Sequence, residues 1–372
     1  MRAWPTTGGS LEITNRRLGA QRIAGTTFTQ AREVVGWLGA VQAQDYLGAL
    51  WAIGLRTTEA CENDVERALA AREIVRTWPM RGTLHFVAAA DARWMIELLA
   101  ARPAAAAAGR LRSLRIDETD LAAARRVLVR HLEGGRRLTR PATYRALEQA
   151  KVATGGQRGL HLLWRLAQDC VICFGPREGR QQTFVLFEEW LPRARRLPRE
   201  EALAELAHRY FRGHGPATMR DFAWWSGLRL AEARLAVLLA GKRLEEEIIH
   251  GERHWFSESA GPSVASHGGA YALPAFDELL VGYTDRGAAL DAARASLVMA
   301  GGAFQPIVVG DGRVLGTWKR RIKAREVVCA LAPFTALGRA KAKATTLAFG
   351  RYARFLGLDL RRERDAVVID GR

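Results

Sequence analysis

One pattern recurs three times along this chain of 372 residues: amphipathic helices, then two short β-rich runs joined by a turn that contains glycine. In the clearest copy, apolar side chains repeat at i, i+3, i+4 and i+7 from Leu203 to Phe211, and Thr218 is a suitable N-cap for the next helix. The elements expected there are helices over 203–211, 219–225 and 230–240, strands over 247–249 and 254–256, and a turn at 250–253. A helix-turn-helix followed by a β-hairpin is the plan of a winged helix.

The two earlier copies share this architecture but have little residue identity with it. The first is expected to contain helices over 29–41, 46–54 and 63–71, then strands over 74–78 and 83–87 around a turn at 79–82. The second is expected to contain helices over 120–132 and 160–168, a helix start between them, and strands over 170–174 and 183–187 around a turn at 175–179. Thr139 as N-cap and Pro141 in the first turn mark that helix start.

The composition changes after residue 257. A Gly/Ser-rich link over 261–269 precedes strand-like runs, and Asp311-Gly312 between two of them is a strong hairpin signal. A helix rich in Lys and Arg is expected over 336–356. The sequence therefore predicts an α+β protein with three tandem winged-helix domains followed by a small β-rich C-terminal domain. The expected boundaries are 1–115, 116–197, 198–260 and 261–372.

The charge balance indicates a polyanionic partner. Lys and Arg number 56 against 39 Asp and Glu, a formal net charge of +17, so double-stranded DNA is the expected partner. An acidic membrane surface is the weaker alternative, because the basic residues are scattered over the whole length. Residues 1–29 contain no apolar run typical of a signal peptide, and no stretch of about 20 apolar residues occurs. We therefore expect a cytoplasmic protein without a membrane partner.

The usual catalytic motifs are absent. The sequence has no G-x-x-x-x-G-K-[ST], H-E-x-x-H or G-x-S-x-G, and no G-x-G-x-x-G ahead of a helix. Cys170 and Cys173 form a C-x-x-C inside an apolar run, without a second ligand pair at zinc spacing, so buried reduced thiols are expected. Neither a metal nor a cofactor is predicted. What stays is a polar cluster with Gln42 and Gln44 at the junction between two apolar helices.

Four short motifs occur along the chain, and both their residues and their order are informative. They are Q-A-Q-D at 42–45, R-G-T-L-H at 81–85, L-P-A-F-D at 273–277 and D-G-R-V-L-G-T-W at 311–318. Together they resemble the AlkZ and YcaQ group of winged-helix DNA glycosylases over nearly the whole chain. The resemblance implies three winged helices and a β-rich domain arranged around a concave DNA-binding face.

The resemblance also implies the catalytic residues. A Gln-Φ-Gln motif marks the AlkZ-like branch, which protects antibiotic producers from their own DNA-crosslinking products, whereas the YcaQ-like branch carries Gln-Φ-Asp. Gln42 and Gln44 match the first pattern and are the predicted catalytic pair. Members commonly have Pro after the following Asp, where this chain has Tyr46. The loop after Asp45 is therefore the point at which this sequence departs from the family.

The expected reaction follows from the lesion. Alkylation of guanine at N7 makes the base a cationic leaving group, so two neutral amides that orient a water are sufficient. The sequence thus predicts a monofunctional glycosylase for bulky cationic alkylated purines. Its expected role is to unhook interstrand crosslinks, in DNA repair or in antibiotic self-resistance. The alternative for Gln42 and Gln44 is that they cap or bridge helix ends.

Further residues are candidates for contact with DNA. They are Arg81, His85, Arg313, Lys319, Arg320 and Arg321. The alternatives are a solvated arginine and a hydrogen-bonded strand histidine at 81 and 85, and a solvated basic run after 313. Asp45 is expected to cap a helix.

Two other functions fit the same fold. Winged helices more often read operators than cleave bonds, so a transcription regulator is the main alternative. Such a regulator should dimerise and prefer one short sequence, whereas three units on one chain can embrace damaged duplex as a monomer, the state expected here. The second alternative is a family member that binds lesions without catalysis.

Overall fold

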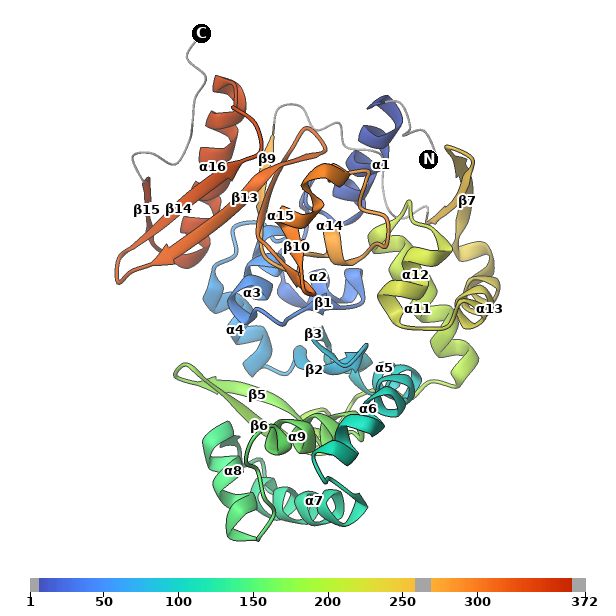
Figure 1. Cartoon of the computed structure of the whole chain (residues 1–372), viewed down its shortest axis with the longest axis vertical. Coiled ribbons are helices and arrows are strands. Elements are labelled where there is room, and N and C mark those ends of the chain that lie inside the picture. Colours follow the sequence, from blue (N-terminus) through green and yellow to red (C-terminus); the bar gives the residue numbers. More distant parts are fainter. Residues whose placement is uncertain (1–6, 258–268, 363–372) are drawn as a thin grey trace. The chain divides into compact units, whose positions relative to one another are not determined.

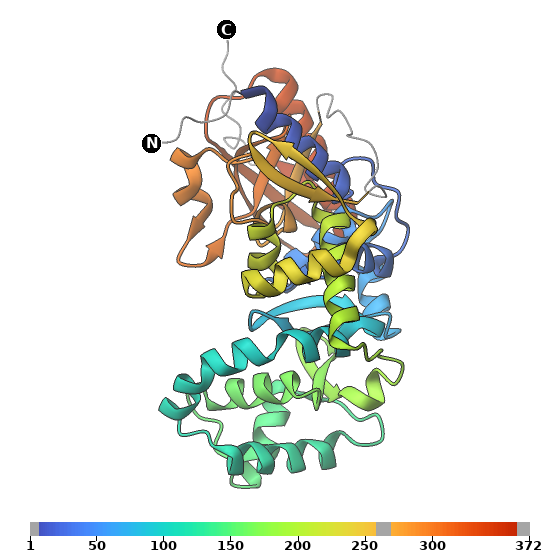
Figure 2. The ribbon, with the colours of Figure 1, turned by 90° about the vertical axis from the view of Figure 1, so that its right-hand side faces the viewer.

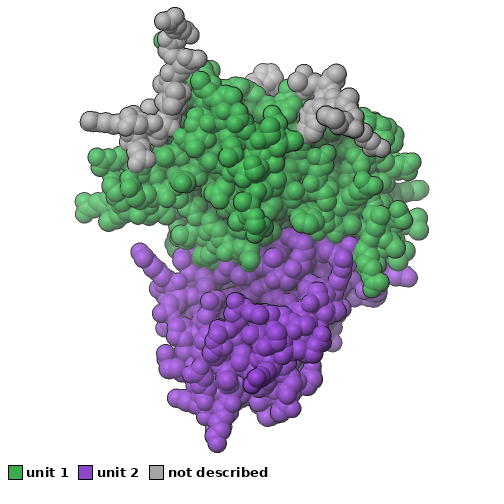
Figure 3. Space-filling view, viewed as in Figure 1, with its two compact units in different colours: residues 1–65, 204–225, 229–372 green, residues 66–203, 226–228 purple. Residues whose placement is uncertain are grey.

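The structure is a computed structural model that describes residues 7–257 and 269–362. It is a mixed α/β protein with two compact units (Figure 3). Unit 1 comprises the described residues of 1–65, 204–225 and 229–372, and unit 2 comprises 66–203 and 226–228. The division into four domains at 115, 197 and 260 stays a prediction.

Unit 1 holds both ends of the described chain. Its N-terminal elements are α1 (Thr7–Ala20), α2 (Ala31–Leu38), β1 (Val41–Gln42) and α3 (Tyr46–Leu55). Three helices contain a unit boundary: α4 (Glu62–Ala70), α11 (Arg199–His214) and α12 (Met219–Ser226). Helix α12 is followed by α13 (Leu230–Ala240), η2 (Gly241–Arg243), and the hairpin of β7 (Glu245–Ile249) with β8 (Glu252–Phe256).

The C-terminal part of unit 1 is built on a five-stranded sheet with the order β15-β14-β13-β12-β9 (Figures 1 and 2). Its strands are β9 (Ala270–Leu273), β12 (Ile307–Gly310), β13 (Arg313–Ile322), β14 (Glu326–Pro333) and β15 (Asp359–Arg362), of which only the β14–β15 pairing is parallel. The remaining elements are α14 (Glu278–Val281), η4 (Ala292–Arg294), α15 (Ala295–Val298), β10 (Met299–Ala300), β11 (Ala303–Phe304) and α16 (Arg339–Leu356).

Two tryptophans tie α3 to this sheet. Trp51 of α3 and Trp318 of β13 both lie with their ring centroids 5.2 Å from that of Tyr352 in α16. Each indole N–H also donates to a carbonyl of β9, Trp51 to Ala272 at 2.7 Å and Trp318 to Leu273 at 2.8 Å. Because buried indoles need hydrogen-bond acceptors, these contacts fix the register of α3 and α16 on the sheet. The helix that follows the Q-A-Q-D motif is therefore rigidly held.

Unit 2 contains two β-hairpins and the helices around them. Its elements are β2 (Ile74–Met80), β3 (Thr83–Ala88), η1 (Ala89–Asp91), α5 (Ala92–Leu99), α6 (Ala101–Ser113), α7 (Glu118–Leu132), β4 (Leu138–Thr139), α8 (Arg140–Gln149), α9 (Arg158–Gln168), β5 (Ile172–Glu178), β6 (Gln181–Leu186) and α10 (Phe187–Trp190). The aromatic centre of its core is a row of rings, with Trp78 and Phe174 5.0 Å apart and Phe174 and Phe184 4.8 Å apart.

Several local predictions are confirmed. Helix α13 has the predicted bounds, and the Thr139 hydroxyl accepts a hydrogen bond from the backbone N–H of Ala142 at the start of α8. Asp311 and Gly312 have φ values of 50° and 72°, the left-handed pair that a type I′ hairpin turn requires. Cys173 is a buried free thiol as predicted, whereas Cys170 is only half-buried, and burial raises the pKa of both thiols.

Other predictions differ from the structure. The expected turn at 175–179 is wrong, because β5 continues to Glu178 and the two-residue turn lies at Gly179 and Arg180. A bulge between Gly175 and Glu178 absorbs the proline, and the ladder then resumes. Helix α1 was not expected at all. The Gly/Ser-rich link, except Gly269, lies outside the described residues.

Candidate active site

The Q-A-Q-D segment connects α2 to α3 within unit 1. Helix α2 ends at Leu38, its C-cap Gly39 has a φ of 81° in the region that favours glycine, and the chain then extends through β1. Gln42 is 8% exposed, Ala43 is buried and Gln44 is exposed. The two predicted catalytic residues therefore lie two positions apart, Gln42 at the end of β1 and Gln44 in the bend before α3, with the buried Ala43 between them.

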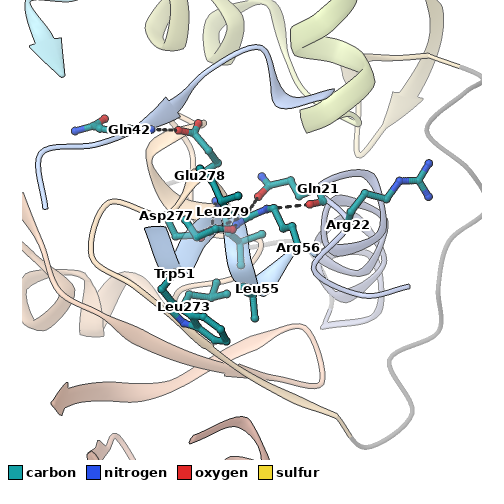
Figure 4. Close-up of polar contacts among 12 residues, drawn as sticks. Gln21, Arg22, Gln42, Trp51, Leu55, Arg56, Leu273, Asp277, Glu278 and Leu279 are labelled. Carbon is teal, nitrogen blue, oxygen red and sulfur yellow. Dashed lines mark hydrogen bonds and ion pairs between the residues drawn. The ribbon is translucent and has the colours of Figure 1, made fainter. Parts of the chain in front are cut away.

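A buried carboxylate lies directly behind this segment. The backbone N–H of Gln42 donates to Oε1 of Glu278 at 2.9 Å (Figure 4). Oε2 of the same carboxylate accepts from the indole N–H of Trp225 at 2.9 Å and lies 3.2 Å from Nε2 of His214. The Gln42 side chain points away from Glu278 in Figure 4. Glu278 thus holds the backbone of the motif, and the side-chain carboxamide of Gln42 lies on the opposite side of the segment.

The other end of α3 is held by the neighbouring acid. Arg56, the C-cap residue of α3, forms a bidentate pair with Asp277, with both N···O distances 2.9 Å. Its guanidinium also donates to the carbonyls of Gln21 and Ala52 and to Oε1 of Gln21 (Figure 4). Asp277 in turn caps α14 by accepting from the Leu279 N–H. Consecutive acids at 277 and 278 therefore fix both ends of the stretch from Gln42 to Arg56.

Asp45 has a different partner from the one expected. It occupies the N-cap position of α3, and its carboxylate pairs with Arg320 of β13 at 3.1 Å. A Cβ at Gly48 would lie 2.6 Å from Oδ2 of Asp45, so only glycine leaves room for this carboxylate. Asp45 joins the motif to the C-terminal sheet.

Strand β13 carries four of the predicted DNA-contact residues, and they do not form one patch. Arg320 faces α16, where its guanidinium lies 5.8 Å from the Tyr352 ring centroid, and Asp45 already balances its charge. Lys319 and Arg321 are exposed on the other face. Arg313 begins the strand, about 20 Å from Lys319 at a rise of about 3.3 Å per residue. DNA contact at each of these positions stays a prediction.

Arg81 and His85 belong to unit 2, on the β2–β3 hairpin. Arg81 and Gly82 form its turn, with φ values of 53° and 72°. His85 is buried, with Nδ1 3.0 Å from the Thr83 carbonyl and Nε2 3.3 Å from the Arg81 guanidinium. This pairing requires a proton on Nδ1 and a lone pair on Nε2, so the hairpin itself uses both ring nitrogens. That geometry agrees with the alternative of a hydrogen-bonded strand histidine, and a DNA contact of His85 stays a prediction.

The sequence analysis missed the residues that support the motif. Glu278, His214, Trp225 and Arg56 were not singled out, and Asp277 served only as part of a motif. One signal was present: two consecutive acids stand inside the apolar stretch 272–281. Charged side chains are almost never fully buried unless they are paired, so such a position predicts buried partners. It does not predict which ones.

The described residues contain no group of three or more His, Cys, Asp or Glu side chains that could hold a metal ion. Between residues 7 and 257 and between 269 and 362, no helix is both long and apolar enough to cross a membrane.

Comparison with known proteins identifies the family. A family model described as DNA glycosylase AlkZ-like matches residues 35–355. The chain belongs to the AlkZ-like DNA glycosylase family. A curated relative from Streptomyces sahachiroi, named Interstrand DNA cross-link repair glycosylase, is 27% identical over 364 residues, which cover 92% of this chain and 95% of the relative. A solved structure, Streptomyces sahachiroi DNA glycosylase AlkZ, matches with a TM-score of 0.78 and 26% identity, covering 98% of this chain and all of that one.

Membership of the AlkZ-like family decides two points. The chain is a DNA glycosylase, a hydrolase that acts on the bond between a base and its deoxyribose. An enzyme is therefore favoured over a transcription regulator, and DNA is the partner that the family implies. The mixed α/β fold is that of a solved AlkZ structure.

Proposed function

We propose that this AlkZ-like protein is a monofunctional glycosylase for bulky cationic alkylated purines, with N7-alkylguanine as the type substrate. The observation that carries the proposal is the Q-A-Q segment, which is held from behind by Glu278 and presents Gln42 and Gln44 from a fixed backbone. The curated relative is named for interstrand crosslink repair, and we extend that role to this chain, in DNA repair or antibiotic self-resistance in the cytoplasm.

The proposed chemistry uses amides in place of a general base. A purine alkylated at N7 or N3 leaves as a neutral base, so the barrier lies in the oxocarbenium-like sugar and in the placement of water. The carboxamides of Gln42 and Gln44 can orient that water and direct carbonyl dipoles at the developing positive charge. The nearest acid in the motif, Asp45, is ion-paired with Arg320 and is not the base. Undamaged bases and neutral lesions such as uracil should therefore not be released.

For the fold, we propose three tandem winged-helix domains and a β-rich C-terminal domain, with boundaries at 115, 197 and 260. Three hairpins follow three sets of helices along the chain, which supports this division: β2–β3, β5–β6 and β7–β8. We propose that the protein embraces duplex DNA as a monomer, through phosphate contacts from Lys319 and Arg321 and from Arg313 and Arg81. The net charge of +17 supports such contacts.

The test is single-turnover release of base from duplex DNA that contains one N7-methylguanine, a bulky N7 adduct or an N7–N7 interstrand crosslink. The proposal predicts release from all three, and no release from uracil-containing or undamaged duplex. A crosslinked base is tethered to both strands and cannot swing fully out of the helix, unlike the base in most glycosylases. A steep loss of rate from methyl to bulky adducts would contradict the proposal.

A further inference from the structure

We propose that Glu278 is a positioning residue for base release: its buried carboxylate sets the backbone that presents Gln42 and Gln44. The inference deepens the function proposed above and rests on it. Glu278 is 1% exposed, so its charge does not serve a surface ion pair or contact with solvent. It contacts three elements around the catalytic segment: β1 through Gln42, α11 through His214 and α12 through Trp225.

The carboxylate serves as an acceptor for several donors at once. Oε1 accepts from the Gln42 backbone, and Oε2 accepts from the Trp225 indole and faces His214. A buried charge is costly unless hydrogen bonds compensate it, so a hydrophobic side chain or a single polar contact would have served packing alone more cheaply. Hydrogen bonds to an ionised acceptor are also shorter and stronger than neutral ones. The arrangement therefore favours accurate placement of the strand.

His214 lies beside the same acid. Its Nδ1 lies 3.2 Å from the Tyr210 carbonyl, and its Nε2 lies 3.2 Å from Oε2 of Glu278. The imidazole therefore bridges the carboxylate and the backbone of α11.

The surroundings are shaped for this ring. The Tyr210 ring stacks on His214 with centroids 4.7 Å apart and an interplanar angle of 11°. A Cβ at Gly282 would lie 2.8 Å from Cδ2 of His214, so glycine there leaves the room that the ring occupies. The Tyr210 hydroxyl donates to the Gly282 carbonyl at 2.8 Å. Helices α11 and α14 thus close around the Glu278–His214 pair, which leaves the carboxylate little freedom to move.

An isosteric amide cannot reproduce these contacts. Glutamine at 278 has one acceptor oxygen and one NH2 group, so one orientation places the NH2 against the Trp225 indole and the other places it against the Gln42 N–H. Either way a buried donor loses its acceptor. A misplacement of about 1 Å remote from the chemistry can cost about 100-fold in rate. Glu278→Gln should therefore slow base release by about 10- to 100-fold while DNA affinity is unchanged, since the proposed phosphate contacts are made by other residues.

The experiment is a double-mutant cycle on the full chain, with single-turnover release from N7-methylguanine duplex and a parallel DNA titration. If Glu278 acts through Gln42, Glu278→Gln should have an effect several-fold smaller in the Gln42→Ala background than in the parent. Asp221→Asn is the matched control: Asp221 is 1% exposed and accepts from the backbone of Thr218 and Thr284, without touching the motif. It should change stability and leave the release rate at the parental value.

A spectroscopic measurement reports the contact itself. In protein labelled with 15N-glutamine, the Gln42 amide proton should resonate downfield because it donates to a carboxylate, and Glu278→Gln should move it upfield. The resonance is assigned from its absence in Gln42→Ala. Should Glu278→Gln not fold, Trp225→Phe removes one donor from the same carboxylate and should slow release a few-fold, again less so in the Gln42→Ala background.

Two results would overturn the inference: release by Glu278→Gln at the parental rate with a shifted Gln42 resonance, or equal effects of the substitution in both backgrounds. Failure of the proposed function looks different, because the parent would then release no alkylated base and neither arm of the cycle could show a rate to slow. If the parent protein releases the base and Gln42→Ala releases it slowly, the proposed function stands. The cycle then tests the role of Glu278 alone.

Discussion

Replacement of Arg56 by Met should destabilise unit 1 strongly. The Arg56 side chain is fully buried, and its five N–H donors make five hydrogen bonds, two of them to Asp277 and three to Gln21 and Ala52. Methionine fills a similar volume but removes both guanidinium donors from the 1% exposed Asp277 carboxylate, which keeps the hydrogen bond from the Leu279 N–H. Removal of one partner of a buried ion pair costs about 3–5 kcal/mol, so Arg56→Met should cost that much.

The assay is urea denaturation followed by tryptophan fluorescence, with the transition of unit 1 analysed separately because multidomain chains rarely unfold in one step. Arg56→Met/Asp277→Asn is the matched variant, since it removes both charges. It should be more stable than Arg56→Met alone by about 1–3 kcal/mol, because the buried acceptor is then neutral. Two results would refute this reasoning. One is that the losses in free energy of unfolding caused by Arg56→Met and by Asp277→Asn simply add in the double variant. The other is a loss below about 1 kcal/mol for Arg56→Met.

The remaining predictions concern chemistry, DNA binding and pH. Gln44→Asp should retain base release and acquire a pH dependence that the parent lacks, because a carboxylate can take up a proton; a dead variant would speak against a water-orienting role. Lys319→Ala should reduce the slope of log affinity against log salt by about 1, whereas Lys343→Ala on α16 should not; equal slopes for both remove β13 from the interface. Burial lowers the pKa of His208 and His254 in the folded protein. As the pH falls through about 6.5, the unfolded chain therefore binds more protons at these two side chains than the folded protein does. The free energy of unfolding should therefore fall from pH 7 to pH 5, and His254→Gln should lessen that fall; an unchanged slope contradicts it.

Local chemistry made much of the fold predictable. The bounds of α13 follow from its apolar spacing, and the turn at Asp311-Gly312 follows from the two left-handed φ values that this dipeptide tolerates. The predicted strand ended at residue 174, too early, because Gly175-Pro176 is a turn signal. The bulge that carries β5 past the proline depends on its pairing with β6, which the local sequence does not contain.

The site was predictable only in part. The four motifs located Gln42 and Gln44, but the contact between Gln42 and Glu278 joins residues 236 positions apart. The pairing of Asp45 with Arg320 is equally remote in sequence, so a basic run looked free for DNA. Such partners depend on how α14 and β13 pack against α3, and no periodicity or spacing encodes that packing. The same holds for His85, whose hairpin partners appear only once β2 and β3 are paired.

The central claim is that Gln42 and Gln44 carry out base release, and the most direct measurement is single-turnover release of N7-alkylguanine by the double variant Gln42→Ala/Gln44→Ala. Each amide that orients a group in the transition state contributes about 10- to 1000-fold, so the double variant should be slower by at least that factor. Its DNA affinity should stay near the parental value, because neutral amides add little to phosphate-driven binding. Cleavage at the parental rate by a folded variant that binds DNA normally would contradict the account and make both glutamines structural.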